Sequence, residues 1–193
     1  MSKSREQLND YLSQIDVEGK VVLDVGVQDK PTTRLCKGTP KKLLTLDIDP
    51  QWKPDIVADL NERYALVDKL KDVHPDITFC IEVLEHCWDP VRVIKNLDKV
   101  VPPWGTLYIS TPFINPHHDY VDYNRLTDEW YRKVLPMGGF TNIEITERRA
   151  TLGKTALYSF FLSEGMKISK LRGIDFNSYT YPIGYIIKAR KMP

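Results

Sequence analysis

Acidic residues follow four apolar stretches of this 193-residue sequence, where a parallel sheet would place its ligand site. Asp24 lies in VVLDVG, which ends at Gly26, Asp47 follows KLLTL, Asp59 follows PDIVA, and Glu82 follows ITFCI. Ligands of open α/β sheets bind outside the carboxyl ends of the strands, and a glycine lets the backbone approach a ligand closely. The pattern predicts a ligand crevice that these carboxylates border.

A second group of ionisable side chains lies in the segment PFINPHHDYVDYNR, which follows the apolar stretch TLYIST. Long irregular segments of this kind often carry functional residues, although a solvated loop would have a similar composition. An imidazole, with an unperturbed pKa near ~6.5, can accept a proton at neutral pH. The cluster comprises His117, His118, Asp119, Asp122, Tyr123 and Arg125.

Hydrophobic periodicity predicts the elements that position these groups. Strands are expected from residue 21, over 42–50, 54–60, 77–81 and 106–111, and as an antiparallel pair over 140–148 and 180–190. Helices are expected over 3–15, 31–37, 61–73, from a cap at Asp89 to about Val101, and from Thr127 to about Leu135. The loop between the second and third strands is too short for a helical crossover.

This alternation predicts a three-layer α/β fold with a mostly parallel sheet and a terminal antiparallel strand pair. The length suits a single domain over residues 1–193, with residues 1–18 as a flanking helix. Residues 151–179 are expected to form an insertion between the last two strands.

Composition excludes several classes of partner. Lys and Arg number 27 against 26 Asp and Glu, so the charge gives no reason to expect nucleic acid or an anionic membrane. No apolar run approaches the ~20 residues of a membrane-spanning helix, and the first residues lack the apolar core of a signal peptide. Cys36, Cys80 and Cys87 lack the spacing of a metal site and fit small, neutral, reduced residues, so a cytoplasmic protein without a metal is expected.

Residues 20–148 resemble the class I S-adenosylmethionine-dependent methyltransferases, which carry acids after the first three strands and EVLEH after the fourth. The sequence is most similar to small members of this family whose motifs read LDVGCGDKP and STPF, followed by a His and a D-Y-x-R-x-T segment. The corresponding residues here are LDVGVQDKP, STPF, His118 and DYNRLT. Gln28 replaces the second glycine of the first motif, and PPWG replaces the usual PGG turn.

The resemblance implies a Rossmann-like methyltransferase fold and S-adenosylmethionine as cofactor. Asp47 then accepts hydrogen bonds from the ribose hydroxyls, although Asp49 could do so instead, and Asp59 with Leu60 meets the adenine, although Asp59 could merely cap a helix. Asp24 orients the glycine turn and the cofactor's amino group, unless it only binds loop amides. The full set of expected cofactor-binding residues is Asp24, Gly26, Gln28, Asp47, Asp59, Leu60 and Glu82.

The resemblance also places the methyl acceptor at the segment after the fifth strand. His118, chosen by its spacing from Pro116, is expected to remove a proton from an oxygen or nitrogen of a glycan or small metabolite. The expected acceptor-binding residues are His86, His117, Asp122, Tyr123 and Arg125.

Two other functions remain open. Gln28 and the unusual segment 151–179 also fit a degenerate methyltransferase fold that serves as a structural or partner-binding module, alone or in a larger assembly. A dinucleotide-binding oxidoreductase is less favoured because the first turn lacks G-x-G-x-x-G.

Overall fold

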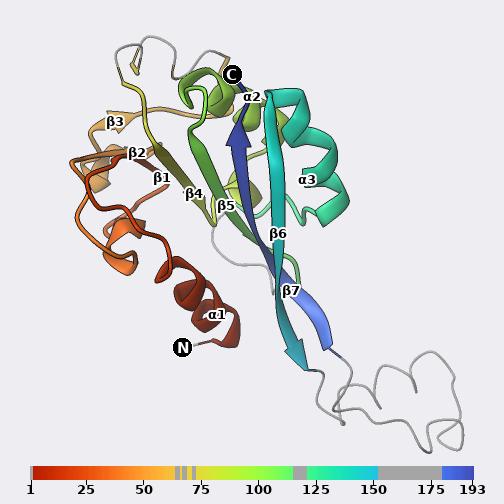
Figure 1. The fold of residues 1–193 in the computed structure, drawn as a ribbon. Coiled ribbons are helices and arrows are strands. Elements are labelled where there is room, and N and C mark those ends of the chain that lie inside the picture. The colour runs from red at the N-terminus through yellow and green to blue at the C-terminus, as the bar shows by residue number, and fades with distance from the viewer. Residues whose placement is uncertain (1, 64–65, 67–68, 71–72, 115–120, 152–179) are drawn as a thin grey trace, which may run out of the picture.

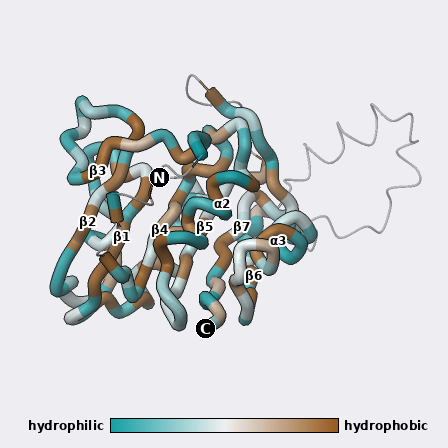
Figure 2. The backbone as a smooth tube through the Cα atoms, turned by 90° about the horizontal axis from the view of Figure 1, so that it is seen from above, coloured by the Kyte–Doolittle hydropathy of each residue, from teal (hydrophilic) through white to brown (hydrophobic). Residues whose placement is uncertain are grey.

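The computed structural model describes residues 2–63, 66, 69–70, 73–114, 121–151 and 180–193. Within these residues, strands form one sheet in the order β3-β2-β1-β4-β5-β7-β6, which Figure 2 shows across the molecule. The strands are β1 Val21–Val25, β2 Lys42–Asp47, β3 Ile56–Val57, β4 Ile77–Ile81, β5 Thr106–Pro112, β6 Phe140–Thr151 and β7 Thr180–Lys191.

The first five strands pair in parallel, whereas β7 is antiparallel to both β5 and β6. This confirms the predicted mostly parallel sheet with a terminal antiparallel pair. The chain passes from β1 outward to β2 and β3, and then returns to β4 on the other side of β1. The strand order therefore reverses at β1, and the adjoining carboxyl ends of β1 and β4 are where an open α/β sheet binds its ligand.

Helices cover both faces of the sheet (Figure 1). Helix α1, Lys3–Leu12, packs with Val22 and Phe79 on one face. Helices α2, Pro90–Val100, and α3, Asp128–Val134, pack with β1 and β5 on the other face. A three-layer arrangement results.

Side-chain caps fix where two of these helices begin. Asp89 accepts a hydrogen bond from the Arg92 amide at 3.0 Å, and Thr127 accepts one from the Trp130 amide at 3.3 Å. Each cap satisfies an amide that has no partner within its helix. Both predicted helix starts are thus confirmed.

The helix predicted over residues 31–37 is wrong in length and type, because only a 3₁₀ turn, Thr32–Leu35, forms there. The Asp24 carboxylate binds the amide and hydroxyl of Thr32 and so fixes the start of the turn. Lys37 then pairs with the segment before β1, since its amide donates to Ile15 and its carbonyl accepts from Val17. This pairing takes the chain out of helical geometry after about one turn.

The helix predicted over residues 61–73 is not seen in the described part of that segment, which forms turns and bends. Leu66 and Leu70 are nevertheless buried, and the Leu70 amide donates to the Leu66 carbonyl at 3.0 Å. Tyr64 and Val67, which completed the predicted apolar face, lie outside the described residues. The burial of Leu66 and Leu70 is therefore in keeping with the predicted apolar face, but the described residues do not form a continuous helix.

The second and third strands are shorter than predicted. The Asp47 carboxylate accepts a hydrogen bond from the Asp49 amide and turns the chain out of β2. Strand β3 pairs only with the last two residues of β2, so it spans Ile56–Val57 and not residues 54–60. The connection contains only a 3₁₀ turn, Pro50–Trp52, which confirms that no helical crossover fits between these strands.

Candidate functional site

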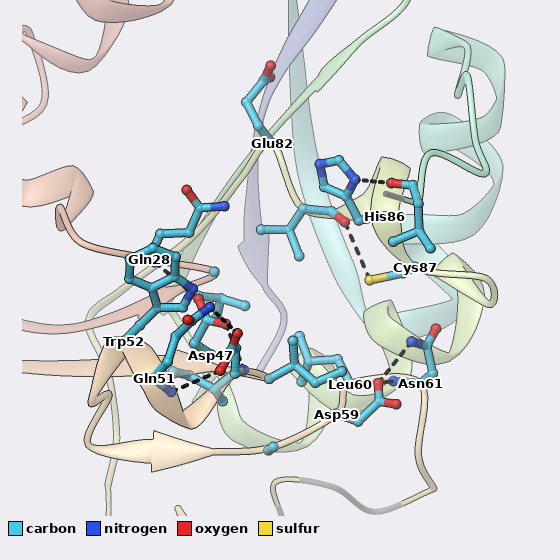
Figure 3. Close-up of a pocket in the computed structure, with 18 residues that line it drawn as sticks. Gln28, Asp47, Gln51, Trp52, Asp59, Leu60, Asn61, Glu82, His86 and Cys87 are labelled. Carbon is cyan, nitrogen blue, oxygen red and sulfur yellow. Dashed lines mark hydrogen bonds between the residues drawn. The ribbon is translucent and has the colours of Figure 1, made fainter. Parts of the chain in front are cut away.

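A cavity of about 590 Å³ lies at the carboxyl ends of β1, β2 and β4 (Figure 3), a volume typical of sites for small molecules and cofactors. Its walls come from the turns after these strands, from the turn after β3 and from Val121. The lining residues are Val25, Gly26, Gln28, Leu46, Asp47, Ile48, Asp49, Gln51, Trp52, Ala58, Asp59, Leu60, Asn61, Glu82, Val83, His86, Cys87 and Val121.

The turn after β1 adopts a backbone that favours glycine. Gly26 has a φ of 73°, and a Cβ on it would lie 2.4 Å from Cγ2 of Val83. Gln28 has a φ of 46°, so it adopts the left-handed conformation in which the family usually has a second glycine. Its side chain is exposed, and its backbone amide donates to Oδ2 of Asp47 at 3.0 Å. The substitution therefore keeps the shape of the glycine turn.

Asp47 is placed at the end of β2 as predicted, and its side chain lines the cavity. Its Oδ2 accepts from the Gln28 amide, and its Oδ1 accepts from the Asp49 amide at 3.0 Å. A carboxylate oxygen can accept more than one hydrogen bond, so both oxygens keep capacity for a ligand. The alternative ribose ligand, Asp49, accepts from the Gln51 amide at the start of the 3₁₀ turn. The ribose role of Asp47 stays a prediction.

Asp59 and Leu60 line the cavity beyond β3, together with Asn61. The Asp59 carboxylate accepts from the amide of Asn61 at 2.8 Å and from its side-chain nitrogen at 2.9 Å. Asp59 therefore closes a turn two residues long and does not cap a helix. The Asn61 side-chain oxygen accepts from the Asp89 amide at 3.1 Å, which joins this turn to the start of α2. The contact with adenine stays a prediction.

Asp24 is fully buried behind the glycine turn and is not among the lining residues. It accepts from the amide of Thr32 at 2.5 Å and from its hydroxyl at 2.9 Å. Burial raises the pKa of Asp24 to about 6, and the hydrogen bonds from Thr32 and Thr33 oppose this rise. The structure thus gives Asp24 the role of binding loop amides, and a contact with the cofactor stays a prediction.

Glu82 follows β4, lines the cavity and has a φ of 56°. Its Oε1 accepts from the Ser110 hydroxyl at 2.7 Å and from Nη2 of Arg148 at 2.8 Å. Arg148 is buried, with 2% exposure, and also donates to the Thr111 carbonyl at 2.6 Å. A Cβ on Gly184, which pairs with Arg148, would lie 2.3 Å from Nη2, so only glycine leaves room for the guanidinium.

Sequence patterns did not indicate Arg148, which lies 66 residues from its partner Glu82. A glycine inside a strand can mark the close approach of another group, and Gly184 is such a signal. Sequence patterns also did not indicate Gln51 and Trp52, which line the cavity beside Asp47. Their signal was their position in the turn directly after β2.

The predicted acceptor-binding residues are only partly brought together. His117 and His118 lie outside the described residues. Asp122 and Arg125 form an ion pair with each other, and their side chains do not line the cavity. Tyr123 is 58% exposed and also lies outside the lining, whereas His86 belongs to it. The acceptor-binding roles stay predictions.

The cysteines are protonated thiols without disulfide partners. Burial raises the pKa of Cys36 to about 11 and that of Cys87 to about 12, and it raises the pKa of the fully buried Cys80 well above its usual value. A high pKa disfavours the thiolate, which is the nucleophilic form. The expectation of small, neutral residues is confirmed.

Two features are absent from the part of the chain that the structure describes. No group of three or more His, Cys, Asp or Glu side chains there is arranged to hold a metal ion. No helix there is both long and apolar enough to cross a membrane.

Comparison with known proteins identifies similar sequences and folds. Residues 3–147 match the family described as Methyltransferase domain. The ubiquinone biosynthesis O-methyltransferase of Coxiella burnetii is 30% identical over 173 residues, covering 85% of this chain and 70% of that protein. An S-adenosylmethionine-dependent methyltransferase of Mesorhizobium loti superposes with a TM-score of 0.60 at 16% identity, covering 98% of both chains. One from Archaeoglobus fulgidus gives 0.58 at 17% identity, covering 98% of this chain and 92% of that one.

Proposed function

Because the chain belongs to the class I S-adenosylmethionine-dependent methyltransferases, we propose that it transfers a methyl group to an oxygen atom of a small metabolite. Several similar proteins carry the name ubiquinone biosynthesis O-methyltransferase, which favours an oxygen acceptor. The same name favours a small metabolite over a glycan.

The observation that carries this proposal is the acidic cavity at the carboxyl ends of the strands, next to β1, where the strand order reverses. Its lining includes Asp47, Asp49, Asp59 and Glu82, and no lysine or arginine belongs to the described lining. S-adenosylmethionine carries a sulfonium and an ammonium group, so carboxylates favour its binding. A Cβ on Gly26 would strike Val83, so this turn requires glycine. The missing side chain also lets the backbone of the turn approach the ligand. These residues fit the cofactor.

Each strand end would hold a different part of the cofactor. Asp47 would accept hydrogen bonds from the ribose hydroxyls, and the turn of Asp59 and Leu60 would border the adenine. The glycine turn and Glu82 would border the methionine end of the cofactor. Gln28 would lie at the margin of that end, and Asp24 would lie behind the glycine turn. A hydrogen bond to a charged acceptor contributes ~1.5–3 kcal/mol, so such contacts are measurable one at a time.

The bound cofactor would supply an activated sulfonium methyl group, so the chain's own residues mainly align the reactants and remove a proton. Alignment alone can lower a barrier by ~7–11 kcal/mol. The sequence resemblance predicts His118 as the proton acceptor, with His117, Asp122, Tyr123 and Arg125 near the methyl acceptor. General-base assistance typically adds ~100- to 10,000-fold.

A degenerate scaffold is less well supported than an enzyme. Gln28 prompted that alternative, but it keeps the left-handed backbone of the glycine turn, and its side chain is exposed. The cavity also retains the acids after β2 and β3.

Calorimetric titration of the full chain with S-adenosylmethionine and S-adenosylhomocysteine tests the proposal. We expect dissociation constants on the order of micromolar for both ligands. The absence of binding at millimolar ligand would contradict the enzyme and favour a structural or partner-binding module. A panel of hydroxyl and amine compounds, assayed by S-adenosylhomocysteine formation, then tests whether the acceptor atom is oxygen.

A further inference from the structure

The ring of His86 is held by the backbone carbonyl of Val121. Its Nδ1 lies 2.5 Å from that oxygen, and a carbonyl oxygen can only accept a hydrogen bond. Nδ1 therefore carries a proton, and in the neutral ring the basic lone pair lies on Nε2. In Figure 3 this second ring nitrogen lies on the side of the ring away from Val121, and His86 belongs to the cavity lining.

The neighbouring Glu85 places a buried carboxyl group beside that nitrogen. Its side chain has no exposure, and Oε1 lies 3.7 Å from Nε2 of His86. Neither oxygen of Glu85 has a hydrogen-bond partner among the described residues. A buried carboxylate without a partner is costly, whereas a cation beside it offsets that cost. Protonation of His86 would create such a cation.

The surroundings of Glu85 favour its neutral form. Burial, followed by the nearby Glu82, raises the pKa of Glu85 to about 8, while Arg148 opposes this rise. Other ionisable groups that interact with Glu85 come from β4, from the turn after it, from the segment before α3 and from α3 itself. They are Cys80, Cys87, Asp122, Arg125 and Tyr131.

We propose that Nε2 of His86 accepts the proton of a hydroxyl methyl acceptor, and that Glu85 is a positioning residue that stabilises the resulting imidazolium. This inference rests on the proposed function, and it makes His86 the proton acceptor in place of His118. As the acceptor's O–H bond breaks, its proton passes to Nε2 and its oxygen bonds to the methyl carbon. The electron pair of the broken carbon–sulfur bond stays on sulfur, so the positive charge ends on His86.

The inference also narrows the class of acceptor. A neutral amine already has a lone pair for attack and can lose its proton afterwards to water. A hydroxyl oxygen becomes a strong nucleophile only as its proton leaves, so a fixed base in the cavity wall serves a hydroxyl acceptor.

The pH dependence follows from the same geometry. Below pH 8 the Glu85 carboxyl is neutral and does not stabilise an imidazolium on His86. Above pH 8 the carboxylate stabilises the imidazolium that forms during transfer. We therefore expect turnover to rise with pH through about 8. Glu85→Gln should abolish this limb of the profile.

The decisive variant is His86→Asn, because the asparagine amide can still donate to the Val121 carbonyl and so keeps the structural contact. Catechol serves as the hydroxyl probe, and calorimetry with S-adenosylhomocysteine reports the cofactor site. We expect turnover to fall ~100- to 10,000-fold while S-adenosylhomocysteine affinity changes less than three-fold. His74→Asn is the matched control, since His74 lies outside the cavity lining, and it should keep wild-type turnover.

Nitrogen NMR of the labelled chain with bound S-adenosylhomocysteine gives a readout that needs no turnover. The neutral His86 ring should carry its proton on Nδ1, and a proton on Nε2 instead would overturn the inference. Turnover of His86→Asn within ten-fold of wild type would also overturn the inference, particularly if His118→Ala is the inactive variant. A wild-type chain that binds S-adenosylhomocysteine but methylates neither catechol nor any other hydroxyl probe would contradict the proposed function itself, and the inference with it.

Discussion

Gln28→Gly tests whether the departure from the family's glycine turn is merely tolerated. With a φ of 46°, Gln28 lies in a region where a side chain costs roughly 1–2 kcal/mol. Glycine removes that cost but adds roughly 0.5–1 kcal/mol, because its unfolded chain has more freedom. The hydrogen bond to Asp47 comes from the backbone amide, which glycine keeps. We expect the free energy of unfolding to rise by ~0.5–1 kcal/mol and cofactor affinity to stay equal or improve.

Chemical and thermal unfolding measure the first quantity, and calorimetry with S-adenosylhomocysteine measures the second. For a chain of this size, ~1 kcal/mol corresponds to a rise in Tm of ~2–4 °C. Trp104→Gly is a suitable control for affinity, because Trp104 also has a positive φ, of 69°, and is absent from the cavity lining. A folded Gln28→Gly variant that no longer binds would make the Gln28 side chain a ligand. A lower Tm would refute the strain argument.

Three further substitutions test individual acids and the predicted base. Asp47→Ala should weaken cofactor binding about ten- to a hundred-fold by calorimetry, and unchanged affinity would move the ribose role to Asp49 or remove it. The folded-state pKa of Asp24 is raised from 3.8 to about 6, so its stabilising contribution is present below 3.8 and is lost as pH rises through about 6. Asp24→Asn should remove ~2.4 kcal/mol of this pH dependence in denaturant unfolding between pH 4 and 7, whereas parallel curves for both proteins would refute the shift. His118→Ala should lower turnover less than ten-fold, because His86 is the proposed base, and a loss of ~100- to 10,000-fold would instead make His118 the proton acceptor.

The fold could be predicted wherever a local pattern determines an element. The segment 77–81 forms β4 as predicted, and the cap at Asp89 starts α2, because burial periodicity and capping act over a few neighbouring residues. The helix predicted over 31–37 failed because its end depends on the pairing of Lys37 with the segment before β1. Contacts between distant segments leave no periodic signal in a short window.

The candidate site divides in the same way. The acids at strand ends could be located, since the carboxyl ends of parallel strands meet at one edge of a sheet. The buried pairing of Arg148 with Glu82 could not, because it depends on the register between β6 and β7 and on the missing Cβ of Gly184. The sequence predicts His86 only as an acceptor-binding residue, because its contacts with the Val121 carbonyl and the buried Glu85 depend on the folded structure.

The acids at the strand ends organise their own turns, whether or not they also bind a ligand. Asp24 holds Thr32, Asp47 holds the amide of Gln28, and Asp59 holds Asn61. Turn amides have no partners within a strand, so a carboxylate at the strand end satisfies them and fixes the turn. Of these three acids, Asp47 and Asp59 also line the cavity. The hydrogen bonds that shape the turns therefore also fix these two carboxylates in place, so little side-chain freedom is left to lose when a ligand binds.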